Sequence, residues 1–450
     1  MTMNEGNSRR RLKLIAARGA IALTIALGVL FVAEPAAKSV SRGSEAAAQV
    51  HQPDRAIQRK HIQRRMIRDR HRQNVRKMRR NRVIARRLAV NAVQRSRQGL
   101  RIRRGELLGL ELTKSRRVQL EERGFTIIRT RTFDGIGLTL SVIATPDKLD
   151  AEEALALLRE EDPEGVYALN HLYSRSDGAD GTEIVAISDV SPAAAQNPNS
   201  EISIGLIDTG VDGTHPAFAE TDLVQKNFGR HNDIVPQDHG AAVASILSRD
   251  IQAAGFRSEI YVADIYAGSE GSWGDALSIF YALDWLADEN VAVINMSLAG
   301  PPNVILEKAV RATTDRGHTI IAAAGNMGPD HPPLYPAAYP DVIAVTAVDT
   351  AGGIYPQANQ GAQIDFAALG VDVPAASGDG ESLYTGTSFA APHVAARAAL
   401  LTPQGGTVYD QLIASAVDLG APGRDPVYGH GVVSAVISEE RSVNNTVAAQ

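Results

Sequence analysis

Short apolar runs that alternate with helical patterns are the feature that most constrains the fold of this chain. Helical patterns lie around 239–249, 273–288 and 302–316. The intervening runs are Ile202–Ile207, Ile260–Ala263, Val291–Asn295, Thr319–Ala324 and Val342–Ala347. Continuous apolar runs separated by helices are typical of a parallel sheet that is covered on both faces. We therefore expect an α/β fold built around such a sheet.

Three motifs in this region supply an acid, a base and a nucleophile in that order. Asp208 follows an apolar run and should end a parallel strand, at the sheet edge where active sites collect. His239 opens a helix-prone stretch, and Ser388 lies in the small-residue run Gly386–Pro392. A serine hydroxyl attacks a carbonyl only when an imidazole takes its proton, and a carboxylate must orient that imidazole. The order predicts a serine hydrolase.

Each motif has a simpler explanation when it is taken alone. Asp208 could belong to a turn, His239 could be a helix cap and Ser388 could be an N-cap. Asp-Thr-Gly also occurs in aspartic proteases, but two carboxylates must share a proton there. The chain holds no second Asp-Thr-Gly or Asp-Ser-Gly, so that reading would require homodimerisation. Only the serine hydrolase explains all three motifs together.

Two further groups could stabilise an oxyanion. The small residues after Ser388 predict a helix with this serine at its amino end, where unpaired backbone N–H groups bind negative charge. Asn326 follows an apolar strand, and its amide could donate to a tetrahedral intermediate. Taken alone, Asn326 could equally be a turn residue.

Residues 201–440 resemble the subtilisin-like serine peptidases, the subtilases. The resemblance rests on the motif Gly-Thr-Ser-x-Ala-x-Pro at Gly386–Pro392, on Val293–Leu298 and on the loop Tyr335–Pro340. It implies a subtilisin-like three-layer sandwich with a mostly parallel central sheet. It also implies the catalytic set Asp208, His239, Ser388 and Asn326.

The same resemblance implies a set of substrate-binding residues. The substrate backbone would run beside Ser297, Leu298 and Ala299. The pocket for the side chain before the scissile bond would have walls formed by Ala323, Ala324 and Gly325 and a floor formed by Leu334. A leucine at the floor predicts a short pocket that prefers Ala or Val.

Three departures from the family pattern stand out. Ala241 replaces a threonine, so a supporting hydroxyl is missing. Ala299 replaces a glycine, and its methyl group is expected to disturb pairing with a substrate strand. The loop after the histidine helix lacks the insertion that usually binds calcium, so we expect no metal and no cofactor.

A small α+β unit is predicted at residues 105–173. Thr113–Arg123 should form a helix ended by Gly124, Asp150 should begin another through a capping box, and strands should fill 125–133, 138–144 and 166–173. By position and pattern this unit is similar to the inhibitory prodomain of the family, which makes it a partner of the peptidase domain. Residues 174–200 read as a linker and 441–450 as a tail.

Charge is strongly segregated along the chain. Residues 51–104 hold 20 Lys and Arg against 2 Asp and Glu, whereas residues 201–440 hold 9 against 29. We expect 49–104 to be a solvated basic segment, partly helical or disordered. It could dock onto the acidic domain or an anionic surface. A nucleic-acid-binding arm is not favoured, because interleaved aromatic residues are missing.

The first 48 residues are predicted to be an export signal. Basic residues precede the apolar run Ala20–Ala33, which is short for a bilayer span. An uncleaved short anchor is the alternative. The chain is thus predicted to be an exported serine endopeptidase made as an inhibited precursor, which acts on proteins or peptides. A catalytically weak, peptidase-like binding protein anchored by its basic segment is the other hypothesis.

Overall fold

A computed structural model describes residues 93–175, 200–230, 233–266, 273–402 and 407–434. All of them lie in one compact unit of the chain, Arg70–Gln450. The predicted export signal, most of the basic segment, most of the linker and the tail fall outside the described residues. Among the helices that are described, none has both the length and the apolar character needed to cross a bilayer.

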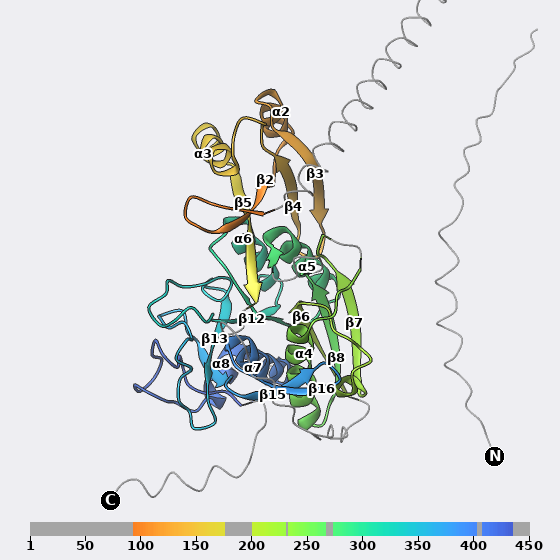
Figure 1. Cartoon of the computed structure of the whole chain (residues 1–450), viewed down its shortest axis with the longest axis vertical. Helices are drawn as coiled ribbons and strands as arrows, with labels where there is room; N and C mark the ends of the chain where they lie inside the picture. The colour runs from red at the N-terminus through yellow and green to blue at the C-terminus, as the bar shows by residue number, and fades with distance from the viewer. Residues whose placement is uncertain (1–92, 176–199, 231–232, 267–272, 403–406, 435–450) are drawn as a thin grey trace, which may run out of the picture. The chain divides into compact units, whose positions relative to one another are not determined.

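A seven-stranded sheet forms the centre of residues 200–434 (Figure 1). Its order is β14-β13-β12-β10-β6-β8-β7, and every pair of neighbours is parallel. The strands are β6 (Glu201–Asp208), β7 (Thr221–Asn227), β8 (Arg257–Asp264), β10 (Val293–Met296), β12 (Thr319–Ala323), β13 (Val342–Val348) and β14 (Phe366–Leu369). The five apolar runs coincide with β6, β8, β10, β12 and β13, so the predicted parallel sheet is confirmed.

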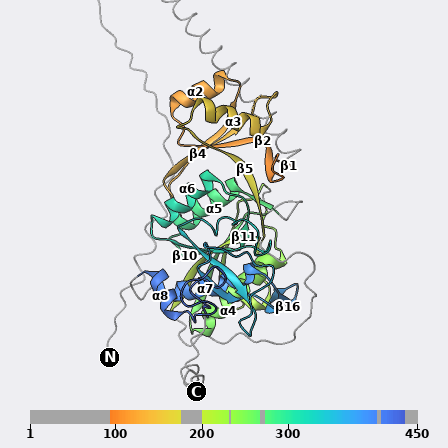
Figure 2. The same cartoon turned by 90° about the vertical axis from the view of Figure 1, so that its left-hand side faces the viewer.

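Helices cover both faces of this sheet and complete the predicted three layers (Figure 2). One face carries α4 (Asp238–Ala253), α7 (Thr387–Leu401) and α8 (Val408–Ser415), and the other carries α5 (Ala276–Asp288) and α6 (Val304–Thr314). Alternation along β6 explains the split, because Leu206 packs with the first group and Ile207 with the second. A single turn of 3₁₀ helix (Pro216–Phe218) and the hairpin β15 (Val373–Ser377) and β16 (Gly380–Tyr384) lie outside the layers.

Residues 93–175 form the predicted α+β unit. Its elements are β1 (Val93–Arg95), β2 (Arg101–Leu110), α2 (Lys114–Glu122), β3 (Thr126–Phe133), β4 (Leu138–Ala144), α3 (Ala151–Glu161) and β5 (Val166–Arg175). The strands pair antiparallel in the order β5-β2-β4-β3. As expected, Gly124 ends α2 with φ +89°, and Asp150 and Glu153 form the capping box of α3.

The two faces of this small sheet have different partners. One face packs on α2 and α3, with Leu107, Phe125 and Leu155 in the core. The other packs on α5 and α6 of the peptidase domain, where the ring centroids of Phe133 and Phe280 are 4.8 Å apart. The small unit and the peptidase domain therefore share one continuous apolar core.

Three predicted boundaries are wrong. The α+β unit does not begin at 105, because β1 and β2 take up residues from 93. Ile102 is fully buried, and the arginines on either side of it contact the peptidase domain, Arg103 at Asp275 and Arg101 over the ring of Trp273. The linker does not begin at 174, since β5 continues to Arg175. The helix expected from 273 begins at Ala276, because β9 (Trp273–Asp275) pairs with β5 first.

Candidate active site

The predicted acid and base meet at the carboxyl edge of the central sheet. Asp208 ends β6, and His239 is the second residue of α4. His239 Nδ1 lies 2.8 Å from Asp208 Oδ1, and the two residues are only 3% and 1% exposed. Asp208 Oδ1 also accepts the backbone N–H of Thr209 at 2.7 Å. The carboxylate thus orients the imidazole ring, as the motif spacing predicted.

Close packing at Gly240 brings α4 against the end of β6. The Gly240 N–H donates to Thr209 Oγ at 2.9 Å, and a Cβ atom on Gly240 would lie 2.4 Å from that oxygen. Only glycine therefore allows this approach. The Thr209 hydroxyl, which the sequence analysis did not single out, ties the acid strand to the base helix beside Ala241, where the usual hydroxyl is missing.

Ser388 is the second residue of α7, and the structure places it beside the base but does not bond it to the base. The ring of Phe389, its neighbour, has its centroid 5.4 Å from that of His239. The Ser388 hydroxyl donates to the Ser297 carbonyl at 3.2 Å. His239 Nε2 is buried and has no hydrogen-bond partner among the described residues. The acid–base half of the predicted triad is formed, whereas the serine–histidine bond is not.

Pro392 explains how the start of α7 is held. A proline has no N–H, so it leaves the carbonyl of the residue four positions earlier without its helical donor. That residue is Ser388, and its carbonyl accepts the Ser297 hydroxyl at 2.8 Å. Ser297 Oγ in turn accepts from Asn295 Nδ2 at 2.9 Å. This chain of bonds holds the nucleophile against the strand that should bind substrate.

Asn326 lies at the amino end of α7. Its side-chain oxygen accepts the Thr387 N–H at 3.1 Å, and the Gly325 N–H donates to Thr387 Oγ at the same distance. These bonds connect the residues after β12 to the first turn of the helix that carries Ser388. The structure thus gathers the predicted oxyanion donor and the nucleophile around one helix end.

The predicted pocket residues also lie together, and Leu334 faces the pocket wall. Gly325 has φ +105°, and a Cβ atom there would lie 2.5 Å from Leu334 Cδ1. Ala323 and Ala324 are buried beside it. Met327, after Asn326, is 65% exposed and adds no charge.

The predicted substrate strand is occupied by the chain itself. Strand β11 (Leu298–Ala299) pairs antiparallel with Ser174 and Arg175 at the end of β5, and β9 pairs with β5 on its other side. The expectation that the methyl group of Ala299 disturbs such pairing is wrong, because a side chain that points out of the pleat leaves the backbone groups free to pair.

Tyr173 anchors this segment. It is fully buried, and its hydroxyl donates to the Pro301 carbonyl at 3.0 Å. Gly300 makes room for the ring, since a Cβ atom there would lie 2.4 Å from it. Tyr173 lies in a strand, as predicted, but its anchoring role could not be predicted, because nothing local distinguishes it from other core tyrosines.

An ion network connects the small unit to the peptidase domain. Arg103 of β2 binds Asp275 at 2.8 Å, and Arg230 binds both Asp275 at 2.9 Å and Glu106 of β2 at 2.7 Å. Burial alone would raise the pKa of Asp275, but Arg230 and Arg103 hold it well below its usual range. Asp275 therefore stays charged. Arg103 and Glu106 therefore join β2 to the peptidase domain through this network.

His171 lies at the same interface. Its Nδ1 is 3.1 Å from the side-chain nitrogen of Asn303, the N-cap residue of α6. Burial, with a smaller contribution from Arg159, lowers the pKa of His171 to about 4. The ring is therefore neutral, and Nδ1 accepts the amide N–H.

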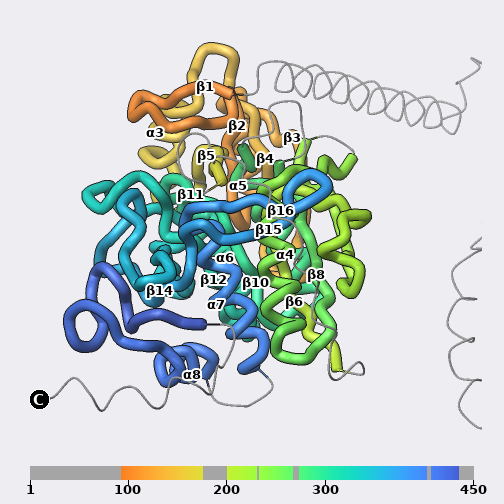
Figure 3. Tube along the Cα trace, turned by 60° about the horizontal axis from the view of Figure 1, so that its bottom comes forward, coloured from red at the N-terminus to blue at the C-terminus, as the bar shows by residue number. Residues whose placement is uncertain are grey.

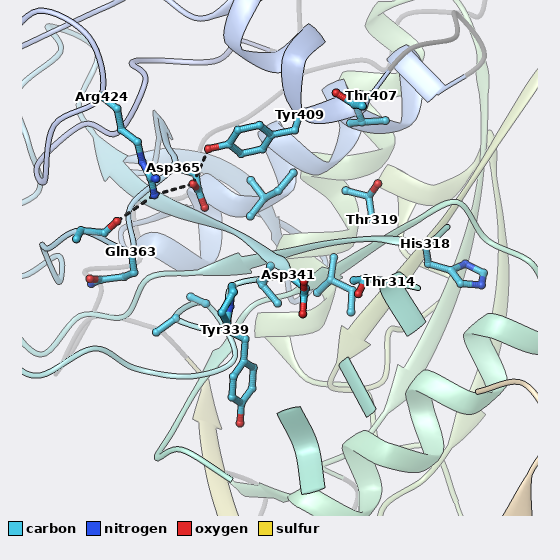
Figure 4. A pocket seen from close by; sticks show the side chains of 18 residues that line it. Thr314, His318, Thr319, Tyr339, Asp341, Gln363, Asp365, Thr407, Tyr409 and Arg424 are labelled. Atoms are coloured by element: carbon cyan, nitrogen blue, oxygen red, sulfur yellow. Dashed lines mark hydrogen bonds and ion pairs between the residues drawn. The ribbon is translucent and has the colours of Figure 1, made fainter. Parts of the chain in front are cut away.

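A cavity of about 620 Å³ lies at the amino ends of β12 and β13, where these strands begin with Thr319 and Val342 (Figure 4). Catalytic residues lie at the opposite, carboxyl ends of the parallel strands, and none of the predicted site residues lines this cavity. Asp365 forms part of its wall and binds Arg424 and Tyr409 at 2.9 and 2.8 Å. We assign this cavity no part in the chemistry.

The structure thus brings together a buried aspartate–histidine pair, a serine at a neighbouring helix end and an extended peptide segment. Residues 199–431 match the model of the subtilase family. The chain belongs to this family and is a serine-type endopeptidase.

Individual relatives support this assignment. The chain is 36% identical over 211 residues to a thermophilic serine proteinase of Bacillus sp. (strain AK1), which is 45% of this chain and 52% of the relative. It is 30% identical to an alkaline protease of Shouchella clausii over 66% of this chain and 78% of the relative. It is 32% identical to subtilisin Savinase of Lederbergia lenta over 55% and 96%.

A solved structure shares the fold. The structure of fervidolysin from Fervidobacterium pennivorans, described as a keratinolytic enzyme related to subtilisin, covers 76% of this chain with 61% of its own. The TM-score is 0.59 at 18% sequence identity, a level that concerns the fold alone.

Proposed function

We propose that Ser388 attacks the carbonyl carbon of a peptide bond while His239 Nε2 takes its proton, with Asp208 holding the imidazole. The proton then passes from His239 to the leaving amine, and water hydrolyses the acyl-enzyme by the reverse route. The buried Asp208–His239 bond carries this proposal. The mechanism requires the Ser388 hydroxyl to rotate from Ser297 O towards His239. Hydrogen bonds between a catalytic serine and its base often form only when substrate binds.

The oxyanion would be held by the Asn326 side chain and the Ser388 backbone N–H. Both lie at the amino end of α7, whose unpaired N–H groups favour negative charge. A fluorophosphonate probe tests the nucleophile: it should label the wild-type chain and fail to label Ser388→Ala. Labelling of both proteins at another residue would refute the assignment.

The second candidate is a binding protein that has lost turnover. Two observations favour it: Ala241 lacks the usual hydroxyl, and the Ser388 hydroxyl is bonded to Ser297 O. The same probe discriminates, because a protein without an activated serine would not react with it.

We further propose that residues 93–175 are a prodomain that blocks the cleft of the precursor. The end of β5 lies between β9 and β11, where a substrate strand would lie. Chain cleavage after β5, within the linker, would release this block. Expression of Ser388→Ala should give only uncut chain, and processing at the wild-type rate would show that cleavage is not autocatalytic.

For the substrate we propose a preference for small apolar residues before the scissile bond. Leu334 lies against Gly325 and shortens the pocket. In a panel of short chromogenic peptides, Ala should be preferred over Phe and Arg. A clear preference for Phe would contradict the proposal.

The remaining proposals concern the first 92 residues. We propose that the chain is exported, on the basis of the basic residues before Ala20–Ala33, and that the basic segment binds an anionic surface or the acidic domain. Mass spectrometry of the amino terminus of the exported protein tests the first. Steep salt dependence of DNA binding, lost when residues 51–92 are deleted, would favour a nucleic-acid arm instead.

A further inference from the structure

A second buried histidine–aspartate pair joins the helix that carries His239 to the helix that carries Ser388. His393 Nδ1 of α7 lies 2.5 Å from Asp250 Oδ2 of α4. The two residues are 8% and 5% exposed. His393 Nε2 is buried without a hydrogen-bond partner among the described residues, so the carboxylate is what orients the ring. The proposed mechanism makes no use of this pair.

A buried cluster that both helices share contains many small side chains. Helices α4 and α7 run next to each other (Figure 3), and they contribute Ala241, Ala244, Ala391 and Ala395 to it, together with larger residues such as Ile246 and Val394. Methyl groups form shallow ridges, so a small slide of one helix along the other changes few of their contacts. A short hydrogen bond between two side chains tolerates only one alignment.

This alignment matters because both helices carry a reacting group in their first turn. Asp250 lies eleven residues after His239, which is about 16 Å along a helix, and His393 lies five residues after Ser388, or about 8 Å. α4 is continuous over this length, and the first turn of α7, which Pro392 leaves without one helical bond, is held by the bond from Ser297 Oγ to Ser388 O. A slide permitted at the pair would therefore change the separation of His239 and Ser388.

We propose that Asp250 and His393 are positioning residues that align α4 on α7 and thereby set the separation of His239 Nε2 and Ser388 Oγ. The inference rests on the proposed catalytic function. Asp250 Oδ1 has a further neighbour, Arg249 Nε at 4.0 Å, which keeps the carboxylate compensated at the helix surface. The pair acts through the two helices and touches no substrate.

The test uses the full chain, with alanine at each position in turn. In Asp250→Ala and His393→Ala the alignment is released, whereas His393→Asn keeps an N–H donor near the position of Nδ1. Titration with a fluorophosphonate counts the sites that are folded and open, and kcat and KM are then measured on a chromogenic peptide. We expect both alanine variants to lose about 10- to 100-fold in kcat per titrated site, with KM changed by less than about threefold. His393→Asn should recover most of the loss.

A matched control removes a hydrogen bond that does not join α4 to α7. In Tyr409→Phe the bond from the Tyr409 hydroxyl to Asp365, 2.8 Å long and located at the cavity of Figure 4, is lost. This variant should unfold at a lower temperature while its kcat per titrated site stays at the wild-type value.

Wild-type kcat per titrated site in both alanine variants would overturn the proposal and leave the pair a purely structural role. If neither variant folds, His393→Gln replaces them, because glutamine carries its N–H group further from the backbone than Nδ1. Low kcat is then expected, and wild-type kcat would overturn the proposal. Absence of labelling and turnover in the wild-type chain after cleavage within the linker would instead refute the catalytic function itself.

Discussion

Two interfaces, one between helices inside the peptidase domain and one between this domain and residues 93–175, differ in character. Inside the domain, α4 and α7 share a buried apolar cluster that is rich in alanine, with the ring contact of His239 and Phe389 at one end and the polar pair Asp250–His393 further along. Against residues 93–175, the domain offers an apolar patch on α5 and α6, and beside it the ion network centred on Asp275 and Arg230. The first interface lies behind His239 and Ser388, and the second holds β5, whose end pairs with β9 and β11.

This difference in polarity indicates which of the two interfaces can separate. Removing one partner of a buried ion network leaves a charge without compensation, which costs several kcal/mol. An interface that depends on such charges responds to cleavage, to mutation and to pH. The α4–α7 interface depends mainly on close apolar packing, with one buried polar pair, so it should stay formed while the other opens.

The largest expected effect concerns chemistry alone. Asp208→Asn should lower kcat by about 10⁴-fold, because the amide cannot stabilise the imidazolium or hold the required tautomer. The attachment of residues 93–175 should be unchanged, since Asp208 does not contact them. Steady-state kinetics on a chromogenic peptide, with hydrogen exchange of the β5 amides in parallel, measures both. Faster hydrogen exchange of the β5 amides in this variant would contradict the independence of the two interfaces.

In a Ser388→Ala background, Arg230→Met should weaken the attachment of residues 93–175 to the peptidase domain more than the changes described below. The change leaves Glu106 buried without its arginine and Asp275 with one arginine in place of two. Opening of β5 should become easier by about 3 kcal/mol, or somewhat more than 100-fold. Hydrogen exchange of the β5 amides measures the change. Lys226→Met, at a cation that packs on aromatic rings, is the matched control and should have a much smaller effect.

Acid should also loosen the attachment. His171 has a pKa of about 4 when it is buried, below the ordinary value of 6.5, so the detached state binds the proton more readily. The stabilisation is complete above pH 6.5 and is lost as the pH falls towards 4, by roughly 3 kcal/mol in total. Exchange rates of β5 in Ser388→Ala, corrected for intrinsic pH dependence, should rise over this window. His171→Gln should flatten the profile, and an unchanged slope would exclude His171 as the cause.

The smallest effect is expected from Tyr173→Phe. It removes only the hydrogen bond to Pro301 O and keeps the buried ring, so about 1 kcal/mol of attachment should be lost. Self-processing of the otherwise wild-type chain should be altered by less than about tenfold. A complete loss of processing would show that the hydroxyl has a role beyond anchoring.

Much of the fold followed from local pattern. The capping box at Asp150 and the glycine after α2 marked helix ends, and apolar runs marked the strands. The acid and base could be predicted because motif chemistry is local, although the hydroxyl of Ser388 points to Ser297 O. The sequence did not predict β1 and β2, because the arginines on either side of Ile102 suggested a solvated segment, whereas Arg101 and Arg103 contact the peptidase domain.

The sequence by itself determined the elements, their order and the chemistry that three motifs could supply, since these depend on neighbouring residues. Only the tertiary structure decided that β5 pairs with β11, that Arg103 meets Asp275, and that His393 meets Asp250. Each of these contacts joins residues more than a hundred positions apart. No periodic pattern in the sequence reveals such partners, because only the packing of the layers brings them together.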